Sequence, residues 1–265
     1  MTGKYWILAI AIVIIALIGV VLDMKRMSTA YPERIYFTPH GILQNPYHAW
    51  PEAPSGVLRS TPAMGFEWVV GWGWNFVPAP KYTASLKIGI SVDGRSFYKT
   101  EDFVRERVNL YSKLHSKNVM SYDWQFDGLA FSFKFFLVKE SSLACLVDIK
   151  NDVATEKTIT LHAIGRLFSS KPYSVSGLRG PDSLVLSSPA LDLVLTLGST
   201  ERSVAQKFAR MESEIEEWIK NNDLTSMEKI ETLFLAYGMM SFELEVPAGA
   251  EKKVVLVLSR GDTRT

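Results

Sequence analysis

Hydrophobic residues follow two different patterns along this chain, and the first is continuous. Residues 5–22 contain no charged residue and no Asn, Gln, Ser or Pro. An α-helix of this length spans about 27 Å, close to the hydrocarbon thickness of a bilayer. Tyr5 and Trp6 at one end, and Lys25 and Arg26 beyond the other, are residue types that favour the membrane interface. The pattern predicts a single transmembrane helix, with residues 1–26 as an N-terminal anchor and residues 5–22 in contact with membrane lipid.

Two properties of this anchor, its retention after export and its orientation in the membrane, each have an alternative. The small residues at 28–30 resemble a signal-peptidase site, but Asp23 and two basic residues intervene, and the apolar run is longer than that of a usual signal peptide. We therefore expect the anchor to be retained. The basic residues after the helix, taken alone, favour a cytoplasmic body. Because a short N-terminal apolar segment commonly exports the chain that follows, we expect a single-pass membrane protein with an extracytoplasmic body.

The second pattern is an alternation of apolar and polar residues, which begins after Gly65. Asp93-Gly94 and Asp127-Gly128 have the composition of tight type I′ hairpin turns. Strands are expected over residues 66–76, 86–92, 104–110, 119–126, 129–139, 143–149, 159–167, 184–188, 191–197, 233–246 and 254–259. Many short strands with tight turns, and no βαβ spacing, predict antiparallel sheets stacked face to face.

The predicted fold class is therefore mostly β: a large antiparallel β-sandwich over residues 63–265, with one amphipathic helix, preceded by the single transmembrane helix. Between anchor and sandwich, residues 27–62 are rich in Pro and form an extended lead-in with a short edge strand near residues 34–38.

The expected amphipathic helix is an insertion in the sandwich near residues 201–222. Its apolar residues recur at steps of four and three, which places them on one helical stripe; they are Val204, Phe208, Met211, Ile215 and Trp218. Thr225 and Glu228 have the spacing of a capping box, which predicts a short second helix.

Composition and charge exclude several classes of protein. Hydrophobic residues make up 47% of the chain, which excludes intrinsic disorder. The 29 basic and 28 acidic residues give a net charge of +1, so the chain has no excess of positive charge for a nucleic-acid partner. The single cysteine, Cys145, excludes an internal disulfide, and its apolar neighbours favour a buried, inert thiol.

The most unusual local feature is the aromatic stripe Trp68, Trp72 and Trp74, flanked by Phe66 and Phe76. Exposed indoles can stack on the apolar faces of sugar rings. The same stripe also suits the inner face of a sandwich strand or a protein interface. We take Trp68, Trp72 and Trp74 as the candidate ligand-binding residues, with carbohydrate as the candidate ligand.

No spacing of reactive residues points to a catalytic, metal or cofactor site. The histidines His40, His48, His115 and His162 lack the spacing of metal ligands, and His162 is expected to be a surface or hydrogen-bonded polar position. Five carboxylates lie in or beside predicted strands, but their spacing singles out no pair: Glu67, Asp123, Asp127, Asp148 and Asp182. The chain has no G-x-S-x-G motif, Walker loop or dinucleotide loop. We assign no catalytic residue, no metal and no cofactor.

Two segments resemble a known family. SLACLVDIKNDVATEKTITLHAIGRLF and the closing VPAGAEKKVVLVLSRG are similar to the N-terminal β-supersandwich domain of glucoamylase-type glycoside hydrolases, akin to galactose mutarotase sandwiches. The likeness covers residues 65–261. In such domains a strand ends in Asn before a polar turn, and a Pro-Gly-like turn precedes the last strand. These roles would fall to Ile149-Lys150-Asn151 and Pro247-Ala248-Gly249.

The resemblance implies a sandwich without the family's hydrolytic chemistry. The catalytic carboxylates of those enzymes lie on a helical toroid after the sandwich, and no toroid follows in this sequence. The mutarotase His and Glu residues match no position here.

The leading functional hypothesis is a non-catalytic binding or accessory domain, with carbohydrate as its ligand. One alternative is a carbohydrate-active enzyme, an epimerase or hydrolase, which requires converging carboxylates on a sheet face. Another is a structural subunit that docks a membrane protein through the sandwich or the helical stripe, in which case the stripe should be exposed.

Overall fold

A computed structural model describes residues 57–60, 64–69, 82–115, 119–139 and 141–263 of the chain. The predicted anchor over residues 5–22 and the predicted edge strand near residues 34–38 lie outside these ranges and stay predictions. Within the described ranges, no helix has the length and apolar character needed to cross a bilayer.

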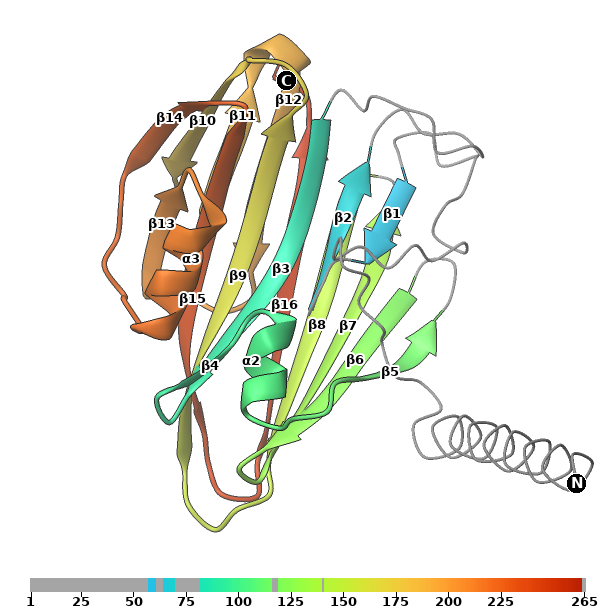
Figure 1. Ribbon diagram of the computed structural model, residues 1–265, viewed down its shortest axis with the longest axis vertical. Helices are drawn as coiled ribbons and strands as arrows, with labels where there is room; N and C mark the ends of the chain where they lie inside the picture. Colours follow the sequence, from blue (N-terminus) through green and yellow to red (C-terminus); the bar gives the residue numbers. More distant parts are fainter. Residues whose placement is uncertain (1–56, 61–63, 70–81, 116–118, 140, 264–265) are drawn as a thin grey trace, which may run out of the picture. The chain divides into compact units, whose positions relative to one another are not determined.

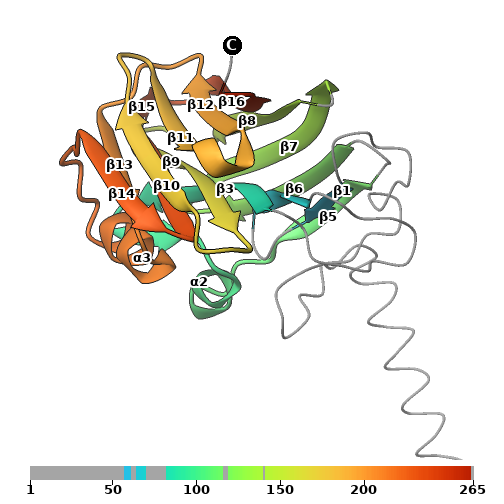
Figure 2. The ribbon, with the colours of Figure 1, turned by 90° about the horizontal axis from the view of Figure 1, so that it is seen from above.

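The described residues form two antiparallel sheets that face each other (Figures 1 and 2). The seven-stranded sheet has the order β1 (Val57–Ser60), β2 (Gly65–Val69), β3 (Tyr82–Val92), β9 (Lys157–Ser169), β15 (Leu235–Val246) and β13 (Ala205–Ala209), with β4 (Arg95–Phe97) also paired to β3. The nine-stranded sheet has the order β14 (Lys229–Leu233), β10 (Ser174–Arg179), β11 (Ser183–Ser188), β12 (Leu193–Ser199), β16 (Glu251–Gly261), β8 (Ser142–Asn151), β7 (Leu129–Lys139), β6 (Val119–Phe126) and β5 (Tyr111–His115). The predicted antiparallel sandwich is confirmed.

Alternation along each strand builds the core between the sheets. On β7, Phe131, Phe133 and Phe135 are buried, whereas the intervening residues face outward. Trp124 of β6 stacks on Phe131 with ring centroids 4.0 Å apart. Because side chains alternate between the two faces of a strand, burial of one face leaves the other free to carry polar groups.

Both predicted hairpin turns are present. Asp93 and Gly94 have φ of 48° and 72°, and Asp127 and Gly128 have φ of 48° and 75°, as a type I′ turn requires. Lys157 Nζ lies 2.6 Å from Asp93 Oδ2 and 2.7 Å from Asp127 Oδ2. The lysine thereby joins two hairpins that belong to different sheets.

The chain changes sheets at both ends of β15. Phe234, with φ of 69°, is the single residue between β14 and β15. At the other end, the turn through residues 247–250 leads into β16 of the nine-stranded sheet. Buried Asn151, at the end of β8, donates through Nδ2 to Val246 O at 2.9 Å and to Thr155 O at 2.8 Å. Asn151 therefore bonds the two turns that the resemblance singled out.

The predicted helix over residues 201–222 is wrong in its first half. The helix α3 spans Glu212–Lys220, whereas Ala205–Ala209 is strand β13. Phe208 points into the core between the sheets and Ile215 packs on the outer face of the seven-stranded sheet, so the apolar stripe combines residues of two elements. Phe208 and Ile215 are buried and Trp218 is partly buried, whereas Val204 and Met211 are exposed, so the five residues form no continuous exposed docking stripe. The helix begins where Glu214 Oε2 accepts hydrogen bonds from the main-chain N–H groups of Arg210 and Met211.

Two other expectations are wrong. Residues 100–105 form helix α2 (Thr100–Arg105) where a strand over residues 104–110 was expected. Asp102 Oδ2 accepts from the main-chain N–H groups of Tyr98 and Lys99, which stabilises the helix start, and Phe103 is the buried residue while Val104 is exposed. The second helix expected after Thr225 is absent; those residues lead into β14, because Ser226 and Met227 bond to the edge of β13.

Strands β5 and β10 have no counterpart among the predicted strands, and further differences concern the ends of elements. The 3-10 helix η1 (Pro189–Leu191) precedes β12. Strand β1 pairs with β2, so Val57–Ser60 belong to the sheet, although they lie within the segment expected to be an extended lead-in.

Candidate functional site

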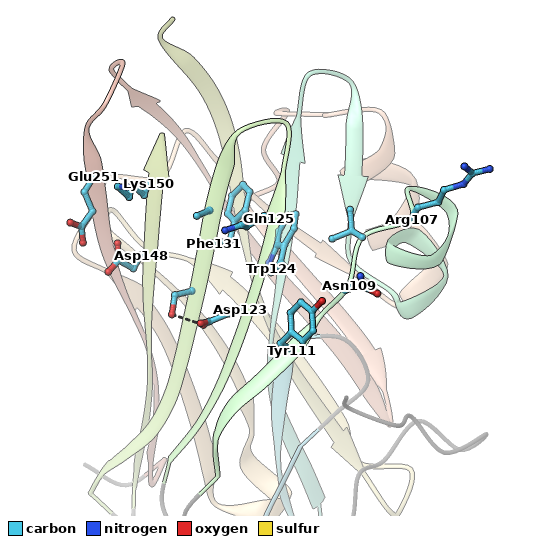
Figure 3. Close-up of a pocket in the computed structure, with 13 residues that line it drawn as sticks. Arg107, Asn109, Tyr111, Asp123, Trp124, Gln125, Phe131, Asp148, Lys150 and Glu251 are labelled. Atoms are coloured by element: carbon cyan, nitrogen blue, oxygen red, sulfur yellow. Dashed lines mark hydrogen bonds between the residues drawn. The ribbon is translucent and has the colours of Figure 1, made fainter. Parts of the chain in front are cut away.

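A hollow with polar lining lies on the outer face of the nine-stranded sheet, over β5 to β8 and β16 (Figure 3). Its volume is about 750 Å³. Asp123, Gln125, Ser132, Asp148, Lys150 and Glu251 line it. We call this hollow the outer-face pocket.

Strand register explains why these side chains converge. Tyr111 pairs with Asp123, Asp123 with Ser132, and Ser132 with Asp148, on four neighbouring strands. Directly paired residues on adjacent strands point to the same face, so the four form one polar row across the sheet. Within it, Ser132 Oγ donates to Asp123 Oδ1 at 2.8 Å.

A carboxylate pair, Asp148 and Glu251, lies at the β8–β16 side of the pocket. Burial, followed by a hydrogen bond with Glu251, raises the pKa of Asp148 above its ordinary value. Hydrogen bonds from Lys253 and Asp148 lower the pKa of Glu251; Lys253 Nζ lies 2.7 Å from Glu251 Oε1 and 3.9 Å from Asp148 Oδ2. Asp148 therefore holds a proton more readily than Glu251 does. This difference suits Asp148 to act as an acid and Glu251 to act as a base.

The structure separates the five candidate carboxylates. Asp123 and Asp148 share the pocket, whereas Asp127 lies in its turn and Asp182 is exposed in the turn before β11. Glu67 lies on β2, and its side chain is outside the description. The carboxylate that the sequence did not indicate is Glu251, which precedes the last predicted strand and enters the pocket because β16 pairs with β8.

The tryptophan stripe is only partly within the described residues. The main chain of Trp68 lies on β2 and pairs with Leu58 and Ala84. Its side chain, and Trp72 and Trp74 entirely, lie outside the description. Their assignment as ligand-binding residues stays a prediction.

Cys145 and His162 are both buried. Burial raises the pKa of the Cys145 thiol well above its ordinary value, as an inert core thiol requires. His162 is fully covered and its ring nitrogens lie 3.2 Å from Ser91 Oγ and 2.9 Å from Ser241 Oγ. It is the hydrogen-bonded polar position that the sequence suggested. Over the described ranges, no three His, Cys, Asp or Glu residues gather as a metal site would require.

Comparison with known proteins gives a likeness in structure alone. No family model matches the chain, and no curated protein matches its sequence. A bacterial glucoamylase solved in complex with acarbose superposes with a TM-score of 0.51 at 11% identity, over 88% of this chain and 33% of the glucoamylase. The chain thus spans about a third of that enzyme.

Two further structures are related at lower similarity. A galactose mutarotase-like protein from Lactobacillus casei has a TM-score of 0.37 and 10% identity, over 68% of this chain and 85% of its own. A family GH92 α-mannosidase from Bacteroides thetaiotaomicron has a TM-score of 0.41 and 11% identity, over 89% of this chain and 31% of its own. The resemblance inferred from the sequence is confirmed for the fold: the chain is a β-sandwich similar to that of the bacterial glucoamylase.

Proposed function

We propose that the protein is a carbohydrate-binding domain and that its ligand lies in the outer-face pocket. The observation that carries this proposal is the polar row that strand register builds from Tyr111, Asp123, Ser132 and Asp148. Sugar hydroxyls both donate and accept hydrogen bonds, and the row offers carboxylates, hydroxyls and, in Gln125, an amide. A volume of about 750 Å³ lies within the range of small-ligand pockets. The sandwich fold, which carbohydrate-active proteins also use, supports the ligand class.

A binding titration of the full chain tests this proposal. The protein is purified in a detergent without a sugar head group and titrated with glucose, galactose, mannose and their disaccharides, and binding is followed by calorimetry. We expect Asp123→Asn to weaken binding about tenfold, because a hydrogen bond to a charged acceptor contributes about 1.5–3 kcal/mol.

Asp182→Asn is the matched control, since it removes an exposed carboxylate that does not line the pocket. Its binding should equal that of the native protein. Equal binding by Asp123→Asn and Asp182→Asn, or no binding of any sugar by the native chain, would contradict the assignment.

An acid–base reaction on a sugar is the second candidate function, and the opposite pKa shifts of Asp148 and Glu251 favour it. Interconversion of sugar anomers needs one group that donates a proton to the ring oxygen and one that accepts a proton from the anomeric hydroxyl. Asp148 would act as the acid and Glu251 as the base.

Polarimetry of freshly dissolved α-glucose and α-galactose measures this activity. The native chain should speed the approach to equilibrium, and Asp148→Asn should abolish the acceleration while sugar binding persists. If the native rate equals that of buffer, the domain binds without catalysis, which is the role that we favour.

The membrane placement belongs to the same proposal. We propose that residues 5–22 anchor the domain and that the pocket faces the extracytoplasmic side, where glycans are abundant. Trp68, Trp72 and Trp74 remain a candidate second contact for the same ligand; their replacement by Ala in the titration above tests whether they contribute.

A further inference from the structure

A second hollow lies at the edge of the sandwich, away from the strands of the outer-face pocket. Strands β13 and β14 are the terminal strands of the seven-stranded and the nine-stranded sheet. A cavity of about 460 Å³ is lined by Phe208 of β13, Trp218 of α3, and Lys229, Ile230 and Glu231 of β14, among others. We call this cavity the edge groove.

Hydrogen bonds show which main-chain groups of β13 face its open side. Met227 N donates to Gln206 O at 2.8 Å, and Gln206 N donates to Ser226 Oγ at 3.1 Å. The main chain of Gln206 therefore points away from its partner strand β15. Because main-chain direction alternates along a strand, the N–H and C=O of Phe208 point to the same open side.

The same reasoning applies to β14. Arg179 N donates to Glu228 O at 3.0 Å, next to the pairing of Gly177 with Ile230. Even-numbered residues of this segment thus face β10, and the main-chain groups of Lys229 and Glu231 face the open side. Because β14 is the terminal strand of its sheet, no strand among the described residues pairs with this side of Lys229 and Glu231.

The rest of the groove combines a firm apolar floor with charges of both signs. Phe208 and Ile230 are buried, and Trp218 is half-buried with Lys207 Nζ 4.7 Å from its ring centroid. Exposed Arg210 and Lys229 lie at the rim, together with the carboxylate of Glu231. An aromatic ring fixed by a buried cation is a rigid surface for an apolar side chain.

We propose that the edge groove binds an extended segment of a partner polypeptide, which adds as a strand to the open edge of β14. The edge repeats an N–H and a C=O at Lys229 and again at Glu231, and an extended peptide supplies the matching acceptor and donor at the same spacing. An apolar residue of the segment packs on half-buried Trp218, beside the buried Phe208 and Ile230. Flanking residues of opposite charge match the mixed rim. Just before β14, the chain itself forms a similar contact with the edge of β13, where Met227 and Ser226 bond to the main chain of Gln206.

A pair of variants at one position isolates the main-chain contact. Glu231→Pro removes the N–H that faces the open side and leaves the donors that pair with β10 in place, since Pro is tolerated on edge strands. Glu231→Ala removes the same side chain and keeps that N–H. The probe is the peptide acetyl-Lys-Thr-Leu-Thr-Glu-amide with a C-terminal fluorophore, titrated against the full chain in detergent and followed by fluorescence anisotropy.

We expect the native chain and Glu231→Ala to bind the peptide within threefold of each other, and Glu231→Pro to bind at least tenfold more weakly. The same peptide with N-methylated threonines should not bind. No saturable binding to the native chain, equal binding by the two variants, or equal binding of the N-methylated peptide would each overturn the proposal.

If Glu231→Pro does not fold, hydrogen exchange of the native chain, with and without peptide, tests the same main-chain contact. The amides of exposed Lys229 and Glu231 should exchange rapidly in the free protein and slow at least tenfold with saturating peptide. Slow exchange of these amides in the free protein, or no change with peptide, would overturn the proposal.

Discussion

At the scale of single residues, His162 shows how a buried ionisable group is kept neutral. Ser91 Oγ donates to Ile219 O at 3.0 Å, so its lone pair accepts from the Nε2–H of His162. The Nδ1 atom then accepts from the hydroxyl of Ser241. One neutral tautomer satisfies all these groups, and a second ring proton would face Ser241 as a competing donor. Burial lowers the pKa of His162 to about 3.

This pKa shift predicts a loss of stability in mild acid. The unfolded chain protonates His162 below a pKa of about 6.5, whereas the folded chain does so only near 3. Stability from the neutral ring is therefore fully present above pH 6.5 and falls as the pH drops towards 3, by about 2 kcal/mol at pH 5.

Urea denaturation at pH 7 and pH 5 measures this effect, with His162→Asn as the reference, since carboxylates also titrate in this range. The change in unfolding free energy should be about 2 kcal/mol larger in the native chain than in the variant. Equal changes would show that His162 is protonated in the folded state.

At the scale of elements, helix α3 is held on the outer face of the seven-stranded sheet by apolar and charged contacts. Ile215 and Ile219 are buried against the sheet. Glu212 Oε1 lies 2.6 Å from Lys87 Nζ. Beyond the helix, Asp223 forms an ion pair with Lys207, which is 2% exposed. This pair lowers the pKa of Asp223 to about 2, chiefly through the hydrogen bond from Lys207.

Removing one partner of this pair should cost more than removing both. Asp223→Ala leaves the Lys207 ammonium buried without its counter-ion, and we expect a loss of about 2–3 kcal/mol, allowing for the partial exposure of Asp223. The double variant Lys207→Met with Asp223→Ala should recover most of this loss. Thermal or urea denaturation measures both; additive losses would contradict the interpretation of the pair.

The predicted helix over residues 201–222 is wrong because two elements, β13 and α3, share one apolar pattern. The strands over residues 119–126 and 129–139 were predicted with their full bounds, because alternation and an Asp-Gly turn act locally. The spacing of the apolar residues from Val204 to Trp218 is that of one helix, although β13 forms the first part of this segment. Phe208 and Ile215 are both buried, but on opposite faces of one sheet. Only the tertiary fold separates these cases. Glu214, three residues after Met211, is the local indication of the true helix start.

At the scale of the whole molecule, the candidate site depends on register across strands that are distant in sequence. Asp123 and Asp148 were among the candidate carboxylates, but their common face follows from the pairing of β6 with β7 and of β7 with β8. Glu251 joins them through the pairing of β16 with β8, across about a hundred residues. The spacing of residues along a chain does not encode such pairings. The sequence therefore indicated two of the carboxylates but not that they share a pocket.

The anchor predicts how the whole protein partitions in cells. Full-length protein should remain in the membrane pellet after alkaline carbonate extraction, and deletion of residues 5–22 should release it to the supernatant, because no helix among the residues that the structure describes is long and apolar enough to span a bilayer. A protease added to intact cells should cleave the body if it faces outward. Recovery of the full-length chain in the carbonate supernatant would contradict the anchor.

The single residue Phe234 has a consequence for how the two sheets come apart. The chain leaves the nine-stranded sheet through Phe234, forms β15 of the seven-stranded sheet and returns to the nine-stranded sheet as β16, so an interior strand of one layer is covalently joined to the other layer at both ends. We therefore expect that neither sheet can unfold while the other stays folded. Heat, denaturant or mechanical pulling should accordingly melt the two layers in one shared step, and a cut in the backbone at Phe234 would leave them joined through the β8–β9, β9–β10, β12–β13 and β15–β16 connections.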